Sequence, residues 1–211
     1  YTVDISSDGN TVAIGAPKND GNGASSGHVR IYYWSGNNWL KKGQDIDGEV
    51  QGDKSGFSIS MSSDGNTIVI GSPYNDGTNW NYEIGHVRVF EWSGTSWNQK
   101  GAIIYGESSS DDSGYAVSIS ADGNTIAIGS PRNDGNTLRG GHVRIFNWNG
   151  TSWNQKGNDI DGLSMYIFSG SKVSISSDGN TVALSAPQCR MSPSPCTNAG
   201  GIGSGEGIVR I

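Results

Sequence analysis

One short phrase recurs four times along this chain and limits the folds that it can adopt. The phrase is Asp-Gly-Asn-Thr followed by an alternating apolar run that ends in Pro, and its copies span 7–17, 63–73, 121–131 and 177–187. Its aspartates stand at positions 8, 64, 122 and 178, so successive copies are 56, 58 and 56 residues apart. A second phrase, Gly-His-Val-Arg, keeps the same spacing at 27–30, 85–88 and 141–144, and returns as Gly-Ile-Val-Arg at 207–210. A fixed period of this length is typical of repeat architectures.

Each period predicts four short strands. The first is an alternating run, at 3–5, 57–61, 116–119 and 173–175. The Asp-Gly-Asn turn that follows is a strong hairpin signal, and the second strand is expected to stop at Pro17, Pro73, Pro131 or Pro187. In the second strand Ala13 and Gly15 share one face, where small residues let a neighbouring sheet approach closely.

The third and fourth strands are predicted from a pair of tryptophans. Each third strand ends in a Trp, and a second Trp follows after four residues, which suits a hairpin with the two rings paired across the strands. The pairs are Trp34/Trp39, Trp92/Trp97 and Trp148/Trp153. The fourth strand is expected through 41–43, 99–101 and 155–157, and an acidic loop such as 45–49 then returns to the next period.

Four strands per period, without helical periodicity, predict an all-β fold: a β-propeller of four-stranded antiparallel blades, each of about 56 residues. We expect one domain over 1–211, with blades at 1–54, 55–112, 113–168 and 169–211. The last blade holds three strands, so its edge at 207–211 would be unpaired, which natural proteins avoid. Either the chain is part of a larger ring, or a neighbouring molecule supplies a strand.

Composition excludes several classes of protein. Only 33% of the residues are hydrophobic, but the alternating apolar runs and a net charge of −6 favour a folded β protein over a disordered chain. The excess of acidic residues argues against a nucleic-acid partner, and no apolar run is long enough for a membrane span. The chain starts inside a repeat without Met, so we expect a processed or partial segment of a longer protein.

The strand-end phrases resemble a known family. Gly15-Ala16-Pro17 and the phrases at 71–73 and 129–131, with Ser55–Ile59 and Ser113–Val117, are similar to the FG-GAP repeats of integrin α-subunit propellers. This resemblance implies an extracellular protein, secreted or at the cell surface. Family members often bind calcium between the first two strands, but the turn here offers one carboxylate where calcium takes six to eight oxygens. We therefore expect no metal and no cofactor.

Acidic residues are predicted to gather on one face. Asp20, Asp76 and Asp134 lie in loops between second and third strands, and the loops between blades carry Asp45, Asp47, Asp159 and Asp161, together with Glu49, Asp53, Asp111 and Asp112. Both loop types leave a propeller on the same side. Trp80 and Tyr82 belong to this face and could stack on sugar rings. The face predicts a protein or glycan partner; the alternative is that these aspartates are turn formers.

The remaining polar features receive structural interpretations. His28, His86 and His142 occupy equivalent places in three blades and Ile208 fills the fourth, so we expect a structural role and a blade-to-blade role for the Arg two residues later. Cys189 and Cys196 close a Pro-containing insertion and predict a disulfide in an oxidising compartment. Asn149 begins the one glycosylation sequon.

No nucleophile–base pair, acid–base carboxylate pair or phosphate loop stands above the repeat, so no catalytic residue is predicted. We expect a non-enzymatic extracellular propeller for adhesion, surface structure or binding of proteins or glycans. One alternative is a structural subunit of an extracellular filament, assembled by strand sharing through the edge at 207–211. Another is a carbohydrate-binding or carbohydrate-active propeller.

Overall fold

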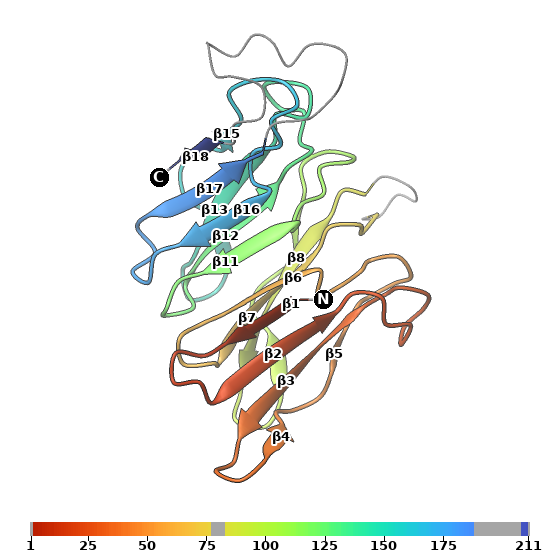
Figure 1. Cartoon of the computed structure of the whole chain (residues 1–211), viewed down its shortest axis with the longest axis vertical. Coiled ribbons are helices and arrows are strands. Elements are labelled where there is room, and N and C mark those ends of the chain that lie inside the picture. Colours follow the sequence, from red (N-terminus) through yellow and green to blue (C-terminus); the bar gives the residue numbers. More distant parts are fainter. Residues whose placement is uncertain (1, 77–82, 188–207, 211) are drawn as a thin grey trace.

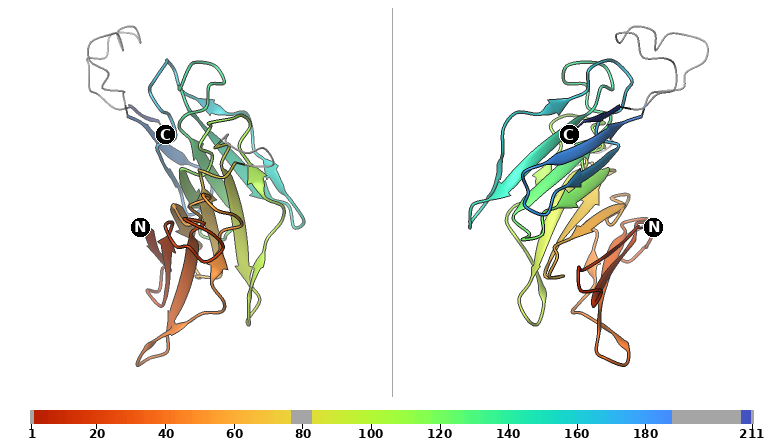
Figure 2. Two further views of the ribbon diagram at one scale, coloured as in Figure 1. Left: turned by 90° about the vertical axis from the view of Figure 1, so that its right-hand side faces the viewer. Right: turned by 60° about the vertical axis from the view of Figure 1, so that its left-hand side comes forward.

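The computed structural model describes residues 2–76, 83–187 and 208–210 and confirms the all-β propeller fold. Its strands form four antiparallel sheets, one for each repeat. The sheets follow one another along the long axis of the molecule, from blade 1 in red to blade 4 in blue (Figure 1), and pack face to face (Figure 2). No helix capable of crossing a membrane occurs in the described residues.

In each of the first three blades the first four strands pair in chain order. Blade 1 holds β1 (Thr2–Ile5), β2 (Thr11–Ala16), β3 (His28–Trp34), β4 (Trp39–Lys41) and β5 (Ile46–Asp47). Blade 2 holds β6 (Ser58–Met61), β7 (Thr67–Ser72), β8 (His86–Trp92), β9 (Trp97–Gln99) and β10 (Ile104–Tyr105). Blade 3 holds β11 (Ala116–Ile119), β12 (Thr125–Ser130), β13 (His142–Trp148), β14 (Trp153–Gln155) and β15 (Ile160–Asp161). In blade 4 the structure describes β16 (Lys172–Ile175), β17 (Val182–Ala186) and β18 (Ile208–Arg210).

The local signals place these strands as predicted. Every second strand ends directly before its proline, because Pro lacks the N–H that a ladder needs. The tryptophans pair across their hairpins, with ring centroids 5.3 to 5.5 Å apart. In the Asp-Gly-Asn turn, Gly123 has a φ of +72°, a conformation that glycine adopts without strain.

The fourth strand differs from the prediction, because it is broken into two pieces that both pair with the third strand. Between them Lys42 turns toward blade 2, where its Nζ donates to the carbonyl oxygen of Gly65 at 2.8 Å. The chain then rejoins β3 as β5, which buries Ile46 against the core. Residues 46–47, expected in a loop, are therefore a short strand that brings acidic side chains beside the start of β3.

The hydrophobic core lies between blades. Blade 1 offers Ala13, Val29, Ile31 and Ile46 to a set from blade 2 that includes Ile59, Met61, Ile68 and Ile70. The same arrangement recurs between blades 2 and 3 and between blades 3 and 4. Close approach needs glycine in the second strand: a Cβ on Gly71 or Gly129 would overlap a backbone carbonyl oxygen of the next blade. The small residues of this strand act as the sequence predicted.

We call the boundary between two successive blades a seam. In the first two seams, hydrogen bonds run from one blade to the preceding one. Arg88 and Arg144 donate to the carbonyl oxygens of Asp47 and Tyr105, at 2.7 and 2.6 Å. Trp97 and Trp153 donate from Nε1 to the carbonyl oxygens of Lys42 and Lys100. These bonds agree with the blade-to-blade role expected of the arginines.

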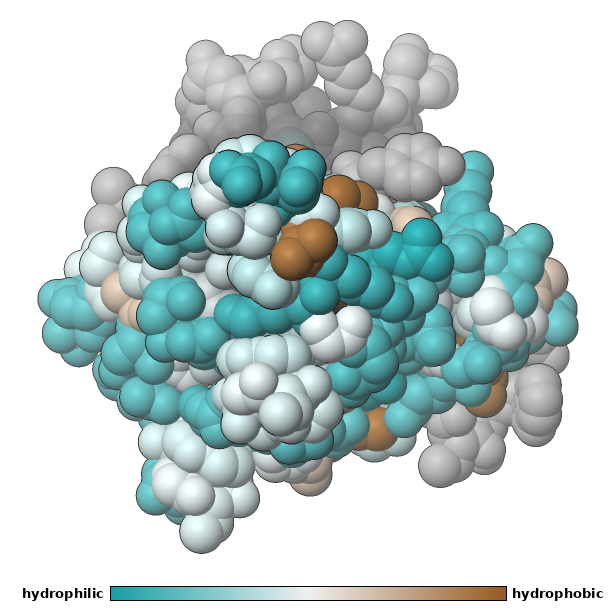
Figure 3. Space-filling model, turned by 90° about the horizontal axis from the view of Figure 1, so that it is seen from below, coloured by the Kyte–Doolittle hydropathy of each residue, from teal (hydrophilic) through white to brown (hydrophobic). Residues whose placement is uncertain are grey.

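Blade 1 has one face without a neighbouring blade among the described residues. Val3 is 70% exposed and Ile5 is 53% exposed, whereas their equivalents Ile59 and Met61 are 9% and 7% exposed. From the blade 1 end of the molecule, separate hydrophobic residues are visible among hydrophilic ones (Figure 3). The first blade therefore shows which side chains a seam normally covers.

Candidate functional site

The seam between blades 2 and 3 brings an imidazole and two carboxylates together. His142, the first residue of β13, is almost fully buried. Its Nδ1 lies 3.4 Å from Oδ2 of Asp159, in the loop before β15, and 4.0 Å from Oε2 of Glu107, in the loop after β10. Two blades thus contribute to one cluster, which we call the seam site: Glu107, His142, Arg144 and Asp159.

A guanidinium and an amide hold the carboxylates in place. Arg144 Nη1 lies 3.5 Å from Oε1 of Glu107, while its Nη2 is fixed by the carbonyl oxygen of Tyr105. Gln155 donates from Nε2 to Oδ1 of Asp159 at 2.6 Å. Arg144 and Gln155 each contact the carboxylate oxygen that points away from His142, so Oε2 of Glu107 and Oδ2 of Asp159 remain turned toward the imidazole. The Glu107 side chain is 44% exposed and that of Asp159 24%, so a ligand from solvent can reach both.

Burial controls the charge of the imidazole. Desolvation lowers the pKa of His142 and Arg144 lowers it further, while Asp159 and Glu107 oppose them. The ring is therefore neutral at neutral pH, despite its two acidic neighbours. Its Nε2 is buried and has no hydrogen-bond partner.

The equivalent place beside His86 keeps only one of the two carboxylates, because Glu49 corresponds to Glu107 but Asp159 has no acidic counterpart. Counting 17 and 19 residues from His86 reaches Ile103 and Tyr105, where blade 3 has Asp159 and Asp161. Neither nitrogen of His86 has a hydrogen-bond partner, and burial lowers its pKa to about 3. Its ring instead packs edge-on against Tyr105, with centroids 5.8 Å apart. The predicted structural role of the histidines fits His86.

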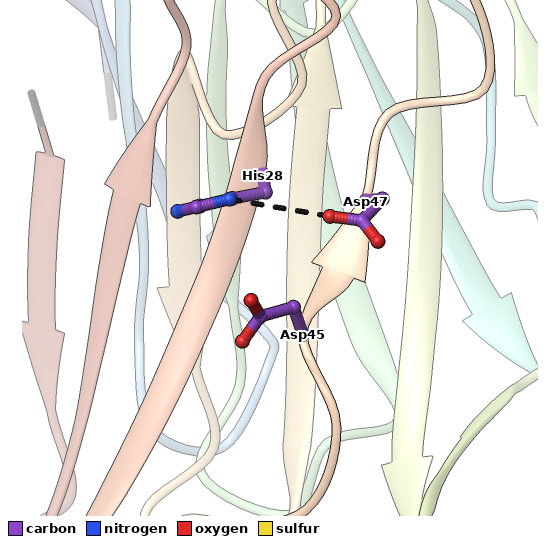
Figure 4. A group of neighbouring side chains, drawn as sticks. All are labelled: His28, Asp45 and Asp47. Carbon is purple, nitrogen blue, oxygen red and sulfur yellow. Dashed lines mark ion pairs between the residues drawn. The ribbon is translucent and has the colours of Figure 1, made fainter. Parts of the chain in front are cut away.

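Blade 1 also places two carboxylates beside its histidine, but they are Asp45 and Asp47, the counterparts of Asp159 and Asp161, and their electrostatic setting differs. His28 on β3 faces Asp47 on β5, with Nδ1 and Oδ1 4.0 Å apart, and Asp45 lies just before that strand (Figure 4). Asp45 binds Arg30 Nε through both oxygens, at 3.2 and 3.1 Å, and Lys41 Nζ at 2.5 Å. Two cations therefore balance the two carboxylates of this cluster.

The predicted acidic face divides into two groups in the structure. Asp45, Asp47 and Asp159 lie beside the blade 1 and blade 3 histidines. Asp20, Asp76 and Asp134 each accept a backbone N–H within their own loop, and Asp161 accepts from Asn136. These contacts agree with the turn-former alternative, and the partner-binding role stays a prediction.

Several predicted features lie partly or wholly outside the described residues. They are Trp80, Tyr82, Cys189 and Cys196, with positions 207 and 211 of the expected edge. Asn149 is described: its Oδ1 accepts bonds from Thr151 and Ser152 within the hairpin turn. Glycosylation there, the disulfide, the extracellular location and self-assembly through 207–211 all stay predictions.

Sequence reasoning missed Glu107, His142 and Arg144 as site residues. The repeat itself was the reason, since residues present in every blade suggest structure. A usable signal was the spacing of aspartates 17 and 19 residues after the histidine, which blades 1 and 3 keep and blade 2 does not.

No family model and no curated protein matches this chain. Solved structures do share its fold. A candidate 6-phosphogluconolactonase from Bacteroides uniformis has a TM-score of 0.56 and 13% identity over 86% of this chain and 46% of its own. A second, from Bacteroides fragilis, has a TM-score of 0.56 and 15% identity over 87% and 46%. The chain spans less than half the length of these proteins, and likeness at this identity shows the fold.

These comparisons correct three predictions. The resemblance to FG-GAP repeats of integrin α-subunits is wrong, since no family model matches and the neighbours are propellers described as candidate 6-phosphogluconolactonases. The predicted adhesion function is wrong, together with its filament and carbohydrate-binding alternatives, because those neighbours are described as enzymes. The expectation that the protein is not an enzyme is wrong for the same reason. The physical reason is that Gly-Ala-Pro and Phe-Gly phrases report strand-end and turn chemistry, which serves many propellers and does not identify a function.

Proposed function

We propose that this chain is part of a propeller hydrolase that opens the ring of sugar-acid lactones, with the seam site as its catalytic centre. The observation that carries the proposal is the convergence of Glu107 and Asp159, from two blades, on the buried neutral His142. The description of the structural neighbours as candidate lactonases supports the same class of reaction.

Lactone hydrolysis needs a base and later an acid. Water adds to the carbonyl carbon while its proton passes to the base; the ring C–O bond then breaks, and the ring oxygen takes the proton back to give a hydroxy acid. Glu107 is the best placed base, since its carboxylate reaches solvent and Arg144 lies 3.5 Å from its other oxygen. That contact holds Oε1, so that Oε2 of Glu107 stays turned toward His142.

Charge indicates which lactones suit the site. Glu107 and Asp159 outnumber Arg144 at the seam site, and the whole chain carries a net charge of −6. A phosphate group placed there would be repelled. We therefore propose uncharged sugar lactones in preference to phosphorylated ones.

The test compares hydrolysis of glucono-δ-lactone and its 6-phosphorylated form, each corrected for the spontaneous reaction. We expect faster turnover of the uncharged lactone, and a loss of about 10²-fold in kcat/KM for Glu107→Gln. Glu49→Gln is the matched control, because Glu49 faces Arg88 in the equivalent place of the preceding seam, which lacks the second carboxylate. No hydrolysis above the spontaneous rate, or equal losses in both variants, would overturn the proposal.

A further inference from the structure

We propose that Glu107, His142 and Asp159 bind a divalent transition-metal ion such as Zn²⁺, with one coordination position left open to solvent. The ligand atoms would be Oε2 of Glu107, Nδ1 of His142 and Oδ2 of Asp159. The link between this ion and catalysis rests on the hydrolase function proposed above, whereas binding of the ion stands on geometry alone.

The separations of the ligand atoms fit such an ion. One ligand atom from each of the three residues lies within 4.8 Å of the other two. The distance from Nδ1 to Oδ2 is 3.4 Å and that from Nδ1 to Oε2 is 4.0 Å. Bonds of about 2.1 Å to a tetrahedral ion place neighbouring ligand atoms about 3.4 Å apart, so only small side-chain movements are needed.

The surroundings aim the ligands inward. Arg144 approaches Oε1 of Glu107 and Gln155 donates to Oδ1 of Asp159, so the outer oxygen of each carboxylate is occupied. The other two oxygens, Oε2 of Glu107 and Oδ2 of Asp159, face the His142 imidazole. The His142 side chain is 1% exposed, and its Nε2 has no hydrogen-bond partner. Hydrogen bonds to the far atoms of metal ligands are the usual means of fixing ligand orientation. Imidazole ligates metals in its neutral form, so the two carboxylates supply the charge that balances a divalent ion.

The other two blades show that this arrangement is not required by the fold. Blade 2 buries His86 equally well with Ile103 and Tyr105 in the corresponding places. Blade 1 keeps both aspartates, but Arg30 and Lys41 occupy the oxygens of Asp45. Among these three described blades, blade 3 alone has a buried histidine beside two carboxylates and only one cation, Arg144.

An ion held here would activate water in place of Glu107, whose Oε2 would then be a ligand, and it would offset the negative charge of the two carboxylates. Three protein ligands with an open position are typical of catalytic zinc sites, and the ion lowers the pKa of a bound water toward neutrality. Glu107 and Asp159 both reach solvent, so the open position would face an incoming substrate.

The experiment titrates chelator-treated, desalted protein with Zn²⁺ by calorimetry, and with Co²⁺ by visible absorption. We expect one site per chain, a Co²⁺ spectrum typical of nitrogen and oxygen ligands, and at least about tenfold weaker binding in Asp159→Asn. His142→Gln should abolish the Co²⁺ spectrum. Because His142 is buried, its substitution could also disturb folding, and the more exposed Asp159→Asn then tests the site independently. His28→Gln and Glu49→Gln are matched controls and should bind as the wild type does.

Absence of saturable binding, or binding that Asp159→Asn leaves unchanged, would overturn the metal site. Loss of binding in His28→Gln would overturn it too, by placing the ion in blade 1. The lactonase function can fail separately from the metal site. Protein that binds the metal but does not hydrolyse lactones would reject the function and keep the metal site. Protein that hydrolyses lactones without metal and does not bind Zn²⁺ would reject the metal site and keep the function.

Discussion

The same residue has different chemistry in successive blades, because its neighbours decide its charge. His28, His86 and His142 begin equivalent strands, yet His86 has no carboxylate partner and His142 has two. Burial lowers the pKa of both His86 and His142, which makes each a neutral ring at neutral pH. A neutral ring beside carboxylates can accept a metal or a proton, whereas one beside Tyr105 fills space.

Asp112 provides a test at the residue scale. It is buried, and desolvation raises its pKa to about 6 from 3.8, opposed by Arg132 at 3.3 Å. The folded state therefore binds a proton more readily than the unfolded chain does, so stability falls as the pH rises from about 4 to 6. Asp112→Asn should remove this fall and raise the melting temperature at pH 7.5 by about 2–4 °C, the effect of about 1 kcal/mol in a chain of this size.

Melting curves at pH 4 and pH 7.5 check this prediction. The advantage of Asp112→Asn should shrink toward pH 4, where the wild-type carboxyl is protonated as well. Asp111→Ala is the contrasting variant, since Asp111 accepts two backbone N–H groups, from Glu107 and Ser108, and loss of this acceptor should destabilise the fold. A wild-type melting temperature that rises between pH 4 and pH 6 with no change in Asp112→Asn would contradict the assignment.

At the scale of elements, the Asp-Gly-Asn turn explains why the repeated phrase persists. In each copy the aspartate accepts from the serine two residues earlier and from the backbone N–H of the asparagine two residues later. One carboxylate thereby fixes the hairpin. The turn sets the register of the first two strands, which then place the apolar residues of each seam.

Asp122→Ala tests this role in blade 3. The hydrogen bond from Ser120 is the main reason that the pKa of Asp122 is lowered. A carboxyl with a lowered pKa stabilises the fold above its unfolded pKa, and this contribution disappears as the pH falls through the folded value. Urea unfolding should show a loss of about 1 kcal/mol at pH 7 that shrinks as the pH falls through the folded pKa of Asp122, which is lowered from 3.8. Asp122→Asn should lose less, because an amide oxygen still accepts the backbone N–H; a loss independent of pH would contradict the role.

At the scale of the whole molecule, stability and function both depend on the seams. Each of the first two seams, between blades 1 and 2 and between blades 2 and 3, buries an apolar set, an arginine and a tryptophan against the preceding blade. Blade 1 carries the same residues without that partner among the described residues, so it is an internal reference for the energetics of a seam. The seam site exists because one blade alone supplies only part of it.

Trp97→Phe measures one seam contact. The substitution removes the donor to the carbonyl oxygen of Lys42, at 2.7 Å, and leaves that acceptor unsatisfied. We expect a loss of about 1–3 kcal/mol in urea unfolding. Trp39→Phe is the matched control: Trp39 is 45% exposed on the uncovered face, and its substitution should cost less than about 0.5 kcal/mol. Equal losses of unfolding free energy in the two variants would contradict this role. They would show that the tryptophan stabilises its own hairpin and not the contact between blades.

The sequence by itself determined the repeat, the strands, their turns and the propeller, because these depend on local chemistry: alternation of apolar residues, Asp-Gly turns and strand-ending prolines. It could not determine the broken fourth strand, since the break at Lys42 depends on a carbonyl oxygen in the next blade. Nor could it bring Glu107 to His142, 35 positions later, because that contact exists only when two blades pack. Tertiary structure alone decided which of the three equivalent histidines has two carboxylate neighbours with only one cation beside them. The reason is that burial and neighbouring charges depend on how two blades pack and not on the strand itself.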